Sequence, residues 1–432
     1  MWRVQSWVKR LPNRSIIIAT SILCLAASGV FFYHKTPPVA AVNTILLGAF
    51  SNETGDSVFE GGLREALAEQ LEQSPYFTLV SESRIHEVLR LTGRQHDNQM
   101  TPEIALDLCQ RTQSGVAITG KISRLGTGYE LVLSAVGCES RETVSIVTGN
   151  ATDQSTVLLA LTKGASTLRK NLGESVATLQ KYQTPGELAS TPSLEAWKTY
   201  SQGREEMVGR SDSAAAVPFF RHAIDLDSKF AMAYAALGTC YFNMGQKQLA
   251  AENTTTAFRL RDKVSEREKY YIESHYYHLA AGDLQQARNV YAIWARTYTQ
   301  DTVPQTNLGE IYGQLGQHES SLDAYKKGLD LAPGSGLNYG SLFDTYVNLD
   351  RFQEAHDVLE QMKKTKTSSN DLRHHVYQLA FYQNDQDVMA RQTEWASSNP
   401  DDSGVILHFA AETSALHGQL GQAREWTRKA VD

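Results

Sequence analysis

The sequence predicts an α+β fold in which one N-terminal transmembrane helix precedes a small mixed α/β domain and an all-α superhelix of repeated helix pairs. Three observations support this prediction. Residues 15–34 are apolar, strand-like and helix-like patterns alternate over residues 43–173, and residues 194–432 repeat a pattern of small and aromatic residues at intervals of about 34. A chain of 432 residues is also too long for one compact core.

Residues 15–34 are expected to cross a membrane, because an apolar helix of this length spans about 30 Å. The preceding residues contain four basic side chains and no acid, namely Arg3, Lys9, Arg10 and Arg14. The positive-inside rule then makes residues 1–14 a cytoplasmic tail and places everything after the linker 35–42 outside a bacterial inner membrane, in the periplasmic or extracytoplasmic space. A cleaved signal peptide is the alternative, although its apolar region would be long for one.

The net charge is distributed unevenly along the chain. The whole sequence carries −7 and residues 1–34 carry +4, so the remainder carries −11. Nucleic acid is therefore not an expected partner, because phosphate recognition requires a basic surface.

The α/β domain, residues 43–173, is predicted to follow the order β-α-β-α-α-β-β-β-α. Strands are expected at 44–50, 76–80, 116–125, 129–136 and 143–150. Helices are expected at 59–71, from 81, from 101 and at 153–172. Thr101 and Pro102 suit a helix cap and a first-turn proline.

Two residue pairs in this domain each allow two interpretations. Gly126 and Gly128 lie between two strands, which favours a hairpin turn over a dinucleotide-binding loop, since the latter leads into a helix. Cys109 and Cys138 could form a disulfide in an oxidising compartment, or could be two small buried thiols.

After a connector at residues 174–193, about seven helix pairs are expected in residues 194–432. Small residues suit positions where paired helices cross, and aromatic residues and Leu fill the gaps between them. The clearest unit contains Tyr234, Leu237, Gly238, Tyr241, Ala250, Thr254 and Ala257; the next strong unit contains Leu308, Gly309, Tyr312, Ser321, Tyr325 and Gly328. Three extra residues are expected around 264–269, in an irregular unit between them. These positions and their period resemble the tetratricopeptide repeat (TPR).

The stretches LLGAFSNETGDSVFEGGLREALAEQLEQ and FTLVSESRIHEVL resemble the small extracytoplasmic α/β domain related to those of Tol-system and curli-export proteins. In that family the domain often lies between a membrane helix and TPRs. The architecture also resembles the sensor half of receptor-like bacterial serine/threonine protein kinases. The resemblance implies a sensing or scaffolding role outside the membrane, and it supplies no activity of its own.

Catalytic motifs are not found in the sequence, which lacks the kinase set, the GxSxG elbow and the phosphate-binding GxxxxGK[ST] loop. His275 and His278 lie one helical turn apart and could share a metal, but the tyrosines between them favour ordinary packing. We therefore expect neither an enzyme nor a cofactor or metal site.

Three functions are consistent with these observations. The first is a non-catalytic, membrane-anchored scaffold that binds a protein or peptide in the repeat groove. The second is the sensor region of a serine/threonine-kinase-type signalling system whose catalytic domain is absent from this chain. The third is an envelope-assembly component.

The groove is expected on the first helix of each pair, where side chains should be free of packing between helices. The candidate groove residues are Thr239, Asn243, Tyr276, Glu310, Gln314, Asp344 and Asn348. Their amides can bridge a peptide backbone. Because this wall has two acids and no base, we expect an extended segment containing Lys or Arg. The alternative is that these are ordinary solvated side chains.

The last repeat ends at Ala430 without a polar capping helix, which terminal repeats normally need. The final helix pair is therefore expected to fray, to self-associate or to meet a partner, unless the chain is truncated.

Overall fold

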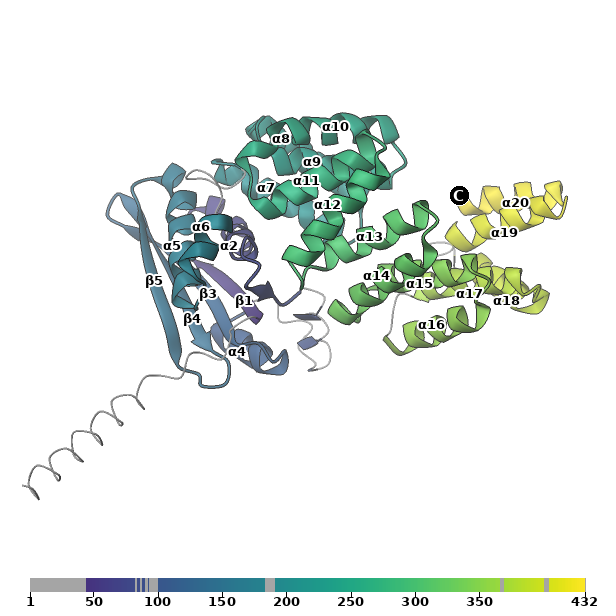
Figure 1. Cartoon of the computed structure of the whole chain (residues 1–432), viewed down its shortest axis with the longest axis horizontal. Helices are drawn as coiled ribbons and strands as arrows, with labels where there is room; N and C mark the ends of the chain where they lie inside the picture. Colours follow the sequence, from purple (N-terminus) through teal and green to yellow (C-terminus); the bar gives the residue numbers. More distant parts are fainter. Residues whose placement is uncertain are drawn as a thin grey trace, which may run out of the picture.

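The computed structural model describes residues 44–81, 84–85, 88–89, 92, 100–182, 191–365, 369–399 and 404–431. The predicted membrane segment, residues 15–34, and most of the helix expected after Ser81 lie outside these ranges. Within these ranges, no helix combines the length and apolar character needed to span a bilayer. The described residues form a mixed α/β region followed by a curved array of paired helices (Figure 1).

Five strands form one mixed sheet in the order β2-β1-β3-β4-β5. Their bounds are β1 Thr44–Asn52, β2 Thr78–Leu79, β3 Val116–Leu125, β4 Gly128–Gly137 and β5 Thr143–Ala151. β1 is parallel to β2 and β3, whereas β3, β4 and β5 are antiparallel. Gly126, with φ of 60°, lies in the turn between β3 and β4, so the hairpin interpretation is confirmed.

Helices cover both faces of the sheet. Ile45 and Leu47 of β1 share one core with α2 (Gly62–Glu72) and α5 (Val157–Asn171), and Leu46 shares the other with α4 (Pro102–Arg111). This division follows from the alternation of side chains along a strand. The Thr101 hydroxyl accepts a hydrogen bond from the Ile104 amide, which confirms the predicted cap of α4.

Two helices begin later than predicted. A 3-10 turn, η1 (Ser57–Phe59), precedes α2, and Gly61 with φ of 84° separates them. A second 3-10 turn, η2 (Gln154–Thr156), precedes α5, because Asp153 and Thr156 cap each other's backbone amides there.

Cys109 of α4 and Cys138, just beyond β4, form a disulfide with their Cα atoms 5.5 Å apart. Of the two interpretations of this pair, the structure therefore supports the bridge. The Gln110 side-chain amide also donates a hydrogen bond of 2.8 Å to the Cys138 carbonyl. Both contacts hold α4 against the sheet.

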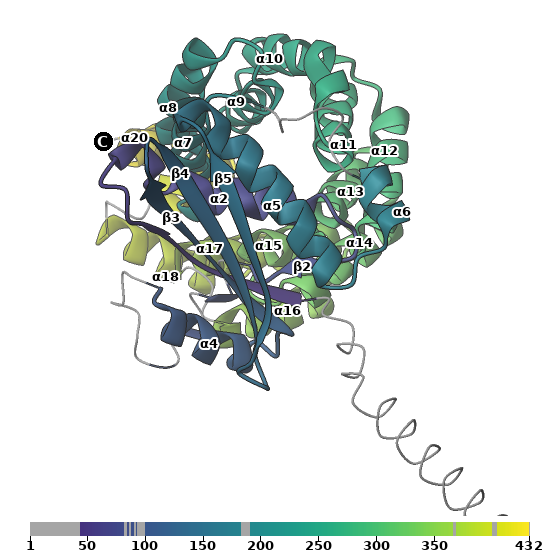
Figure 2. The same ribbon diagram turned by 90° about the vertical axis from the view of Figure 1, so that its left-hand side faces the viewer.

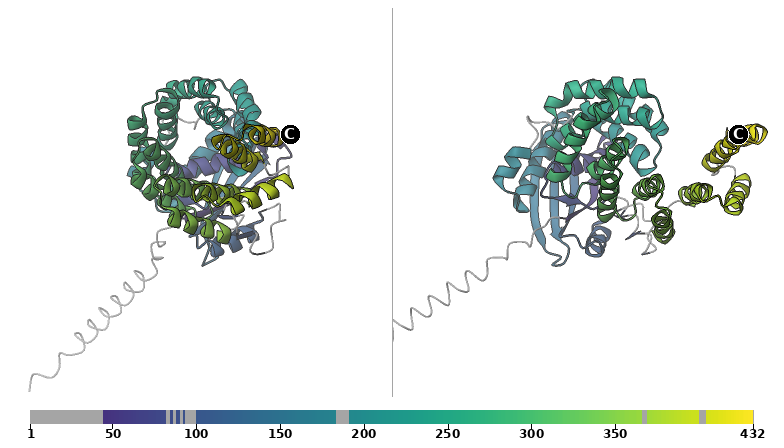
Figure 3. Two further views of the ribbon diagram at one scale, coloured as in Figure 1. Left: turned by 90° about the vertical axis from the view of Figure 1, so that its right-hand side faces the viewer. Right: turned by 45° about the vertical axis from the view of Figure 1, so that its right-hand side comes forward.

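Helix pairs make up the rest of the described chain, seven of them in succession. The pairs are α7 Leu194–Arg204 with α8 Ser213–Leu226, α9 Ala231–Asn243 with α10 Lys247–Leu260, α11 Glu266–His275 with α12 Leu284–Thr297, α13 Thr302–Gln314 with α14 His318–Leu331, α15 Gly336–Asn348 with α16 Phe352–Thr365, α17 Ser369–Tyr382 with α18 Gln386–Ser397, and α19 Gly404–Leu416 with α20 Leu420–Val431. Figure 2 shows α7, α9 and α11 on the inner side of the curve, with α8, α10 and α12 outside them. Figure 3 shows the same curvature from the opposite end.

The turn within each pair contains one residue with positive φ, and these residues mark the repeat in the backbone. They are Ser211, Gly245, Gly282, Gly316, Asp350, Asn384 and Gly418. Every step between neighbours is 34 residues, except the step of 37 from Gly245 to Gly282. The predicted irregular unit is thereby confirmed. Its extra length includes a 3-10 turn, η4 (Arg261–Lys263), and its first helix ends in a π-helical turn, η5 (Tyr276–Ala280).

Glycines lie where paired helices approach most closely. A Cβ on Gly309 would be 2.5 Å from the Tyr325 ring, and one on Gly238 would be 2.7 Å from the Thr254 side chain. The need for small residues at these crossings, predicted from the sequence, follows directly from this distance.

The α/β region and the array share one continuous core, which extends from Ile45 to Ile272. The contacts of η1 and α2 with the array are called the joint below. Lys198 Nζ donates to the Ser57 carbonyl at 2.8 Å, and Arg267 pairs with Glu72 at 3.1 Å. Beyond α2, the Tyr298 hydroxyl donates to the Gln73 carbonyl.

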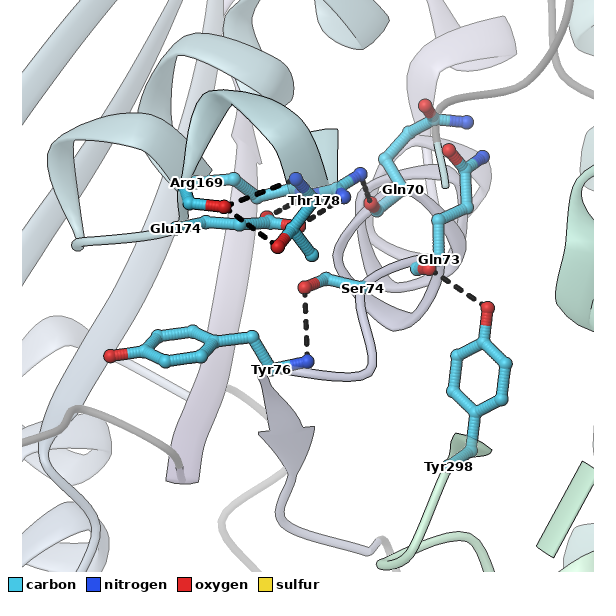
Figure 4. A network of polar contacts seen from close by, with 9 residues as sticks. Gln70, Gln73, Ser74, Tyr76, Arg169, Glu174, Thr178 and Tyr298 are labelled. Carbon is cyan, nitrogen blue, oxygen red and sulfur yellow. Dashed lines mark hydrogen bonds and ion pairs between the residues drawn. The ribbon is translucent and has the colours of Figure 1, made fainter. Parts of the chain in front are cut away.

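On the side of α2 away from the array, a buried ion pair fixes the end of the helix (Figure 4). Arg169 of α5 binds both carboxylate oxygens of Glu174, at 2.7 and 2.9 Å, and donates a third bond of 3.1 Å to the Gln70 carbonyl. Glu174 precedes α6 (Val176–Tyr182), a helix that was not expected in the connector. The end of α2 is therefore held by both α5 and the array.

Candidate functional site

The inner wall is defined here as the face of the first helices that carries the seven candidate residues, Thr239, Asn243, Tyr276, Glu310, Gln314, Asp344 and Asn348. Four of them lie six residues before the positive-φ turn of their repeat: Thr239, Tyr276, Glu310 and Asp344. The other three, Asn243, Gln314 and Asn348, lie two residues before it. The seven residues therefore have equivalent sequence positions relative to the turns of their repeats, although the π-helical turn η5 changes the helix at Tyr276.

The expectation that wall side chains are free of packing between helices is wrong for the first of these rows. Thr239 Oγ1 lies 2.9 Å from the Tyr271 hydroxyl, and Asp344 accepts a hydrogen bond of 3.2 Å from Gln378. Each bond joins the first helices of adjacent repeats. Such contacts arise because the curvature of the array brings the inner helices close together.

Glu310 and Gln314 form a small polar cluster with His278 of the preceding repeat. Gln314 Nε2 lies 3.0 Å from Glu310 Oε1 and 3.1 Å from His278 Nε2. Burial lowers the pKa of His278, an effect only partly opposed by Glu310. His278 is therefore mainly neutral at pH 7, and the cluster keeps the negative charge of Glu310.

Tyr276 does not present a free aromatic face. Its ring stacks on Phe258 of α10, with ring centroids 3.9 Å apart, and also contacts Tyr277 edge-on. The π-helical turn inserts an extra residue into this helix and thereby directs Tyr276 toward its neighbours. Its main role in the structure is packing between helices.

The second row is open to solvent. Asn243, Gln314 and Asn348 are all exposed, and Asn243 is held by a bond of 3.1 Å to the Ser213 hydroxyl. The row continues at the same spacing of 34 residues with Tyr382, whose exposed fraction is 49%, and Leu416, at 75%.

Sequence reasoning did not identify His278, Gln378, Tyr382 or Leu416 as wall residues. A signal for three of them was available, because Gln378 lies 34 residues after Asp344, and Tyr382 and Leu416 continue the row from Asn348. In the sixth repeat, Asn384 takes the position at which four of the seven repeats have glycine. The π-helical turn displaced His278 from the regular spacing.

The wall is acidic over its C-terminal half. The sequences of α13, α15 and α19 contain no Lys or Arg but contribute Glu310, Asp344 and Glu412. The basic residue of α17, Arg373, lies over the Trp395 ring and donates to Gln392, both on α18. Burial raises the pKa of Asp344, and the hydrogen bond from Gln378 partly offsets that rise.

A metal site is not formed by the described residues, among which no three His, Cys, Asp or Glu side chains are grouped suitably. His275 is buried, and its Nδ1 donates to the Tyr271 carbonyl at 2.8 Å. It therefore belongs to the core of the third repeat.

Comparison with known proteins agrees with this geometry. Residues 305–335, which include most of α13 and all of α14, match the tetratricopeptide repeat family. The array has a TPR-type fold. The six other helix pairs of the described chain have a positive-φ residue in the equivalent turn, as this TPR does at Gly316. No curated protein matches the sequence significantly.

Solved structures include several similar TPR proteins. A thermophilic TPR protein of Thermus thermophilus, TTC0263, is 19% identical, with 41% of this chain and 95% of that chain covered and a TM-score of 0.35. PilW, a type IV pilus biogenesis factor, is 14% identical. The match covers 49% of this chain and 96% of that chain, with a TM-score of 0.38. The LpoB C-terminal domain of Salmonella enterica, also similar to part of this chain, is 18% identical, with 26% and 83% covered and a TM-score of 0.24.

Proposed function

We propose that this chain is a non-catalytic, membrane-anchored scaffold that holds an extended, Lys- or Arg-containing segment of a partner protein against the inner wall. The observation that carries the proposal is the open row Asn243, Gln314 and Asn348 beside the acids Glu310 and Asp344. Side-chain amides at equivalent positions in successive repeats can bind a peptide backbone, and acids on helices that contain no Lys or Arg attract cationic side chains. Tyr382 and Leu416 add apolar contacts at the end of the row.

The experiment is selection from a random peptide library by the full chain in detergent. Lys- and Arg-rich sequences should be enriched over Asp- and Glu-rich ones. Asn243→Ala/Asn348→Ala should weaken the selected peptide roughly tenfold, since each lost hydrogen bond contributes about 0.5–1.5 kcal/mol. Asn289→Ala, an exposed amide on the outer helix α12, is the matched control and should leave affinity unchanged. Equal affinities for the wild type and the double variant, with circular dichroism unchanged, would move the binding site off this wall.

The proposed anchor is residues 15–34, with residues 1–14 in the cytoplasm and both the α/β domain 43–173 and the repeats 194–432 outside a bacterial inner membrane. Charge asymmetry in the sequence supports this topology. Protease added to spheroplasts should digest the chain beyond Lys35. Protection of the α/β domain and the repeats from protease until the spheroplasts are lysed would contradict the topology.

Self-association through the last repeat is also part of the proposal. It is supported by the exposed side chains of Leu416, Leu420 and Val431, at 75%, 60% and 82%. Leu420→Lys/Val431→Lys should shift an oligomer to monomer in analytical ultracentrifugation. A wild-type protein that stays monomeric at high concentration would exclude self-association through the last repeat.

A further inference from the structure

The joint contains a cluster of ionisable side chains to which the proposed function assigns no role. The cluster comprises four carboxylates, Glu69, Glu72, Glu268 and Asp301, and two guanidinium groups, Arg204 and Arg267. Glu69 and Glu72 belong to α2, whereas the other four come from the repeat array, on α7, on α11 and just before α13. Tyr200 of α7 is a further titratable neighbour of both Glu69 and Arg204, and Tyr271 of α11 lies next to Tyr200 and Arg204.

One of the two cations of the cluster, Arg267, is already shared between two other acids. Arg267 pairs with Glu72 at 3.1 Å and with Asp301 at 2.9 Å, and Asp301 also accepts a bond from the Trp294 indole. Lys198, the nearby lysine of α7, donates instead to the Ser57 carbonyl. With every group ionised, four carboxylates would face two guanidinium groups.

Glu69 is the member of the cluster least satisfied as an anion. Although the residue as a whole is only half-buried, its Oε1 is shielded from solvent and has no hydrogen-bond partner. Burial, followed by the charge of Glu268, raises the pKa of Glu69 to about 8, and Arg267 and Arg204 only partly oppose this. A proton on this carboxyl removes one of the two excess negative charges.

We propose that the joint is a proton-dependent contact: Glu69 holds a proton while α2 is packed against α7 and α11, and loss of that proton favours separation of α2 from the array. Since the array carries the proposed binding wall and the α/β region carries the proposed anchor, this contact sets how firmly the wall is oriented relative to the membrane.

The sign follows from proton linkage. When α2 separates, Glu69 meets water and returns toward an ordinary carboxyl pKa near 4.5. The packed state then binds the proton more tightly than the separated state, so separation becomes easier as pH rises through the interval between the two values. Between pH 6 and pH 9 the equilibrium constant for opening should rise roughly tenfold to a hundredfold.

Hydrogen exchange on the full chain in detergent measures this opening, once rates are corrected for the pH dependence of chemical exchange. Peptides from α2 and α11 should lose protection from pH 6 to pH 9, and a reference peptide from β4 should not, which separates opening from global unfolding. In Glu69→Gln, an isostere of the protonated acid, the opening constant should be independent of pH. Glu65→Gln is the matched control on α2, with its side chain 44% exposed, and should behave like the wild type.

An unchanged pH dependence in Glu69→Gln, or a wild type without any, overturns the proposal. If Glu69→Gln does not fold, Glu268→Gln replaces it, since its remaining carbonyl oxygen can still accept from the Ser265 amide. That variant removes the neighbouring charge that raises the proton affinity of Glu69 most. The rise of the opening constant with pH should therefore be smaller in this variant and should occur at lower pH. A profile identical to that of the wild type would equally overturn the proposal.

Discussion

The Tyr298 hydroxyl donates a hydrogen bond of 3.0 Å to the backbone carbonyl of Gln73, a residue 225 positions earlier in the chain. Tyr298 is buried in the turn after α12, and Gln73 ends α2, so this bond crosses the joint (Figure 4). Tyr298→Phe keeps the ring but leaves a buried carbonyl unsatisfied, which should cost about 1–3 kcal/mol.

Urea unfolding monitored by tryptophan fluorescence measures that loss. Tyr382→Phe, at a tyrosine that is 49% exposed, is the control and should change stability by less than about 0.5 kcal/mol. Equal midpoints for the two variants would show that the Tyr298 bond contributes nothing to the joint.

The Cys109–Cys138 bridge should contribute about 2–4 kcal/mol, because it closes a loop across 29 positions in the unfolded chain. Reduction with dithiothreitol should therefore lower the Tm of the wild type. Cys109→Ser/Cys138→Ser should start lower and not respond to the reductant. A wild type with the same Tm under both conditions would contradict the stabilising role.

Gly309→Ala should destabilise the fourth repeat by about 1–3 kcal/mol, because the new methyl group would overlap the Tyr325 ring. Gly421→Ala provides the contrast: Gly421 lies in α20, and no atom would come within 4 Å of its Cβ. That substitution should be neutral or stabilising by up to about 1 kcal/mol, since alanine favours helix. Chemical denaturation of both variants tests the pair, and a reversed order would be inconsistent with the close helix crossing.

His275 should make the third repeat sensitive to acid. Burial lowers the pKa of His275 to about 4 from 6.5. Above pH 6.5 the side chain is neutral in both the folded and unfolded states, so it has no effect on pH dependence there. As pH falls from 6.5 toward 4, only the unfolded state takes up the proton, and stability should decrease by roughly 1–2 kcal/mol at pH 5.

Urea midpoints at pH 7.5 and pH 5 measure this decrease, which should be smaller in His275→Gln. His408→Gln, at a histidine whose side chain is 65% exposed, should retain the full wild-type decrease. Identical decreases in the wild type and His275→Gln would assign the acid sensitivity to other groups.

Much of the fold could be predicted from residue patterns because those patterns record local packing. The helix predicted at 59–71 corresponds to α2, whose buried face includes Leu63, Leu67 and Leu71 at helical spacing. Gly238 and Gly309 marked the helix crossings of two repeats. What could not be predicted depends on contacts between distant residues. The 3-10 turn before α2 is separated from that helix by the positive φ of Gly61. The strand expected at 76–80 is short because only two of its residues pair with β1.

For the wall as well, sequence spacing predicted the positions of residues but not their contacts with neighbouring helices. Register along the chain identified Thr239, Glu310 and Asp344, because a fixed period places equivalent side chains on one face. The hydrogen bonds of Thr239 to Tyr271 and of Asp344 to Gln378 depend on how closely successive helices approach, which the curvature of the array determines. The same holds for the contact between Gln314 and His278. The stacking of Tyr276 on Phe258 depends on a π-helical turn that has no clear sequence signature.

The single step of 37 residues between Gly245 and Gly282 lies in the repeat that supplies Arg267 and Glu268 to the joint. The irregular step thus lies among the repeats that contact the α/β region, and every later step is a uniform 34. Growth or loss of whole 34-residue units beyond Gly316 would lengthen or shorten the wall without altering its attachment. The length of the wall and the attachment of the array to the α/β region can therefore change independently in evolution.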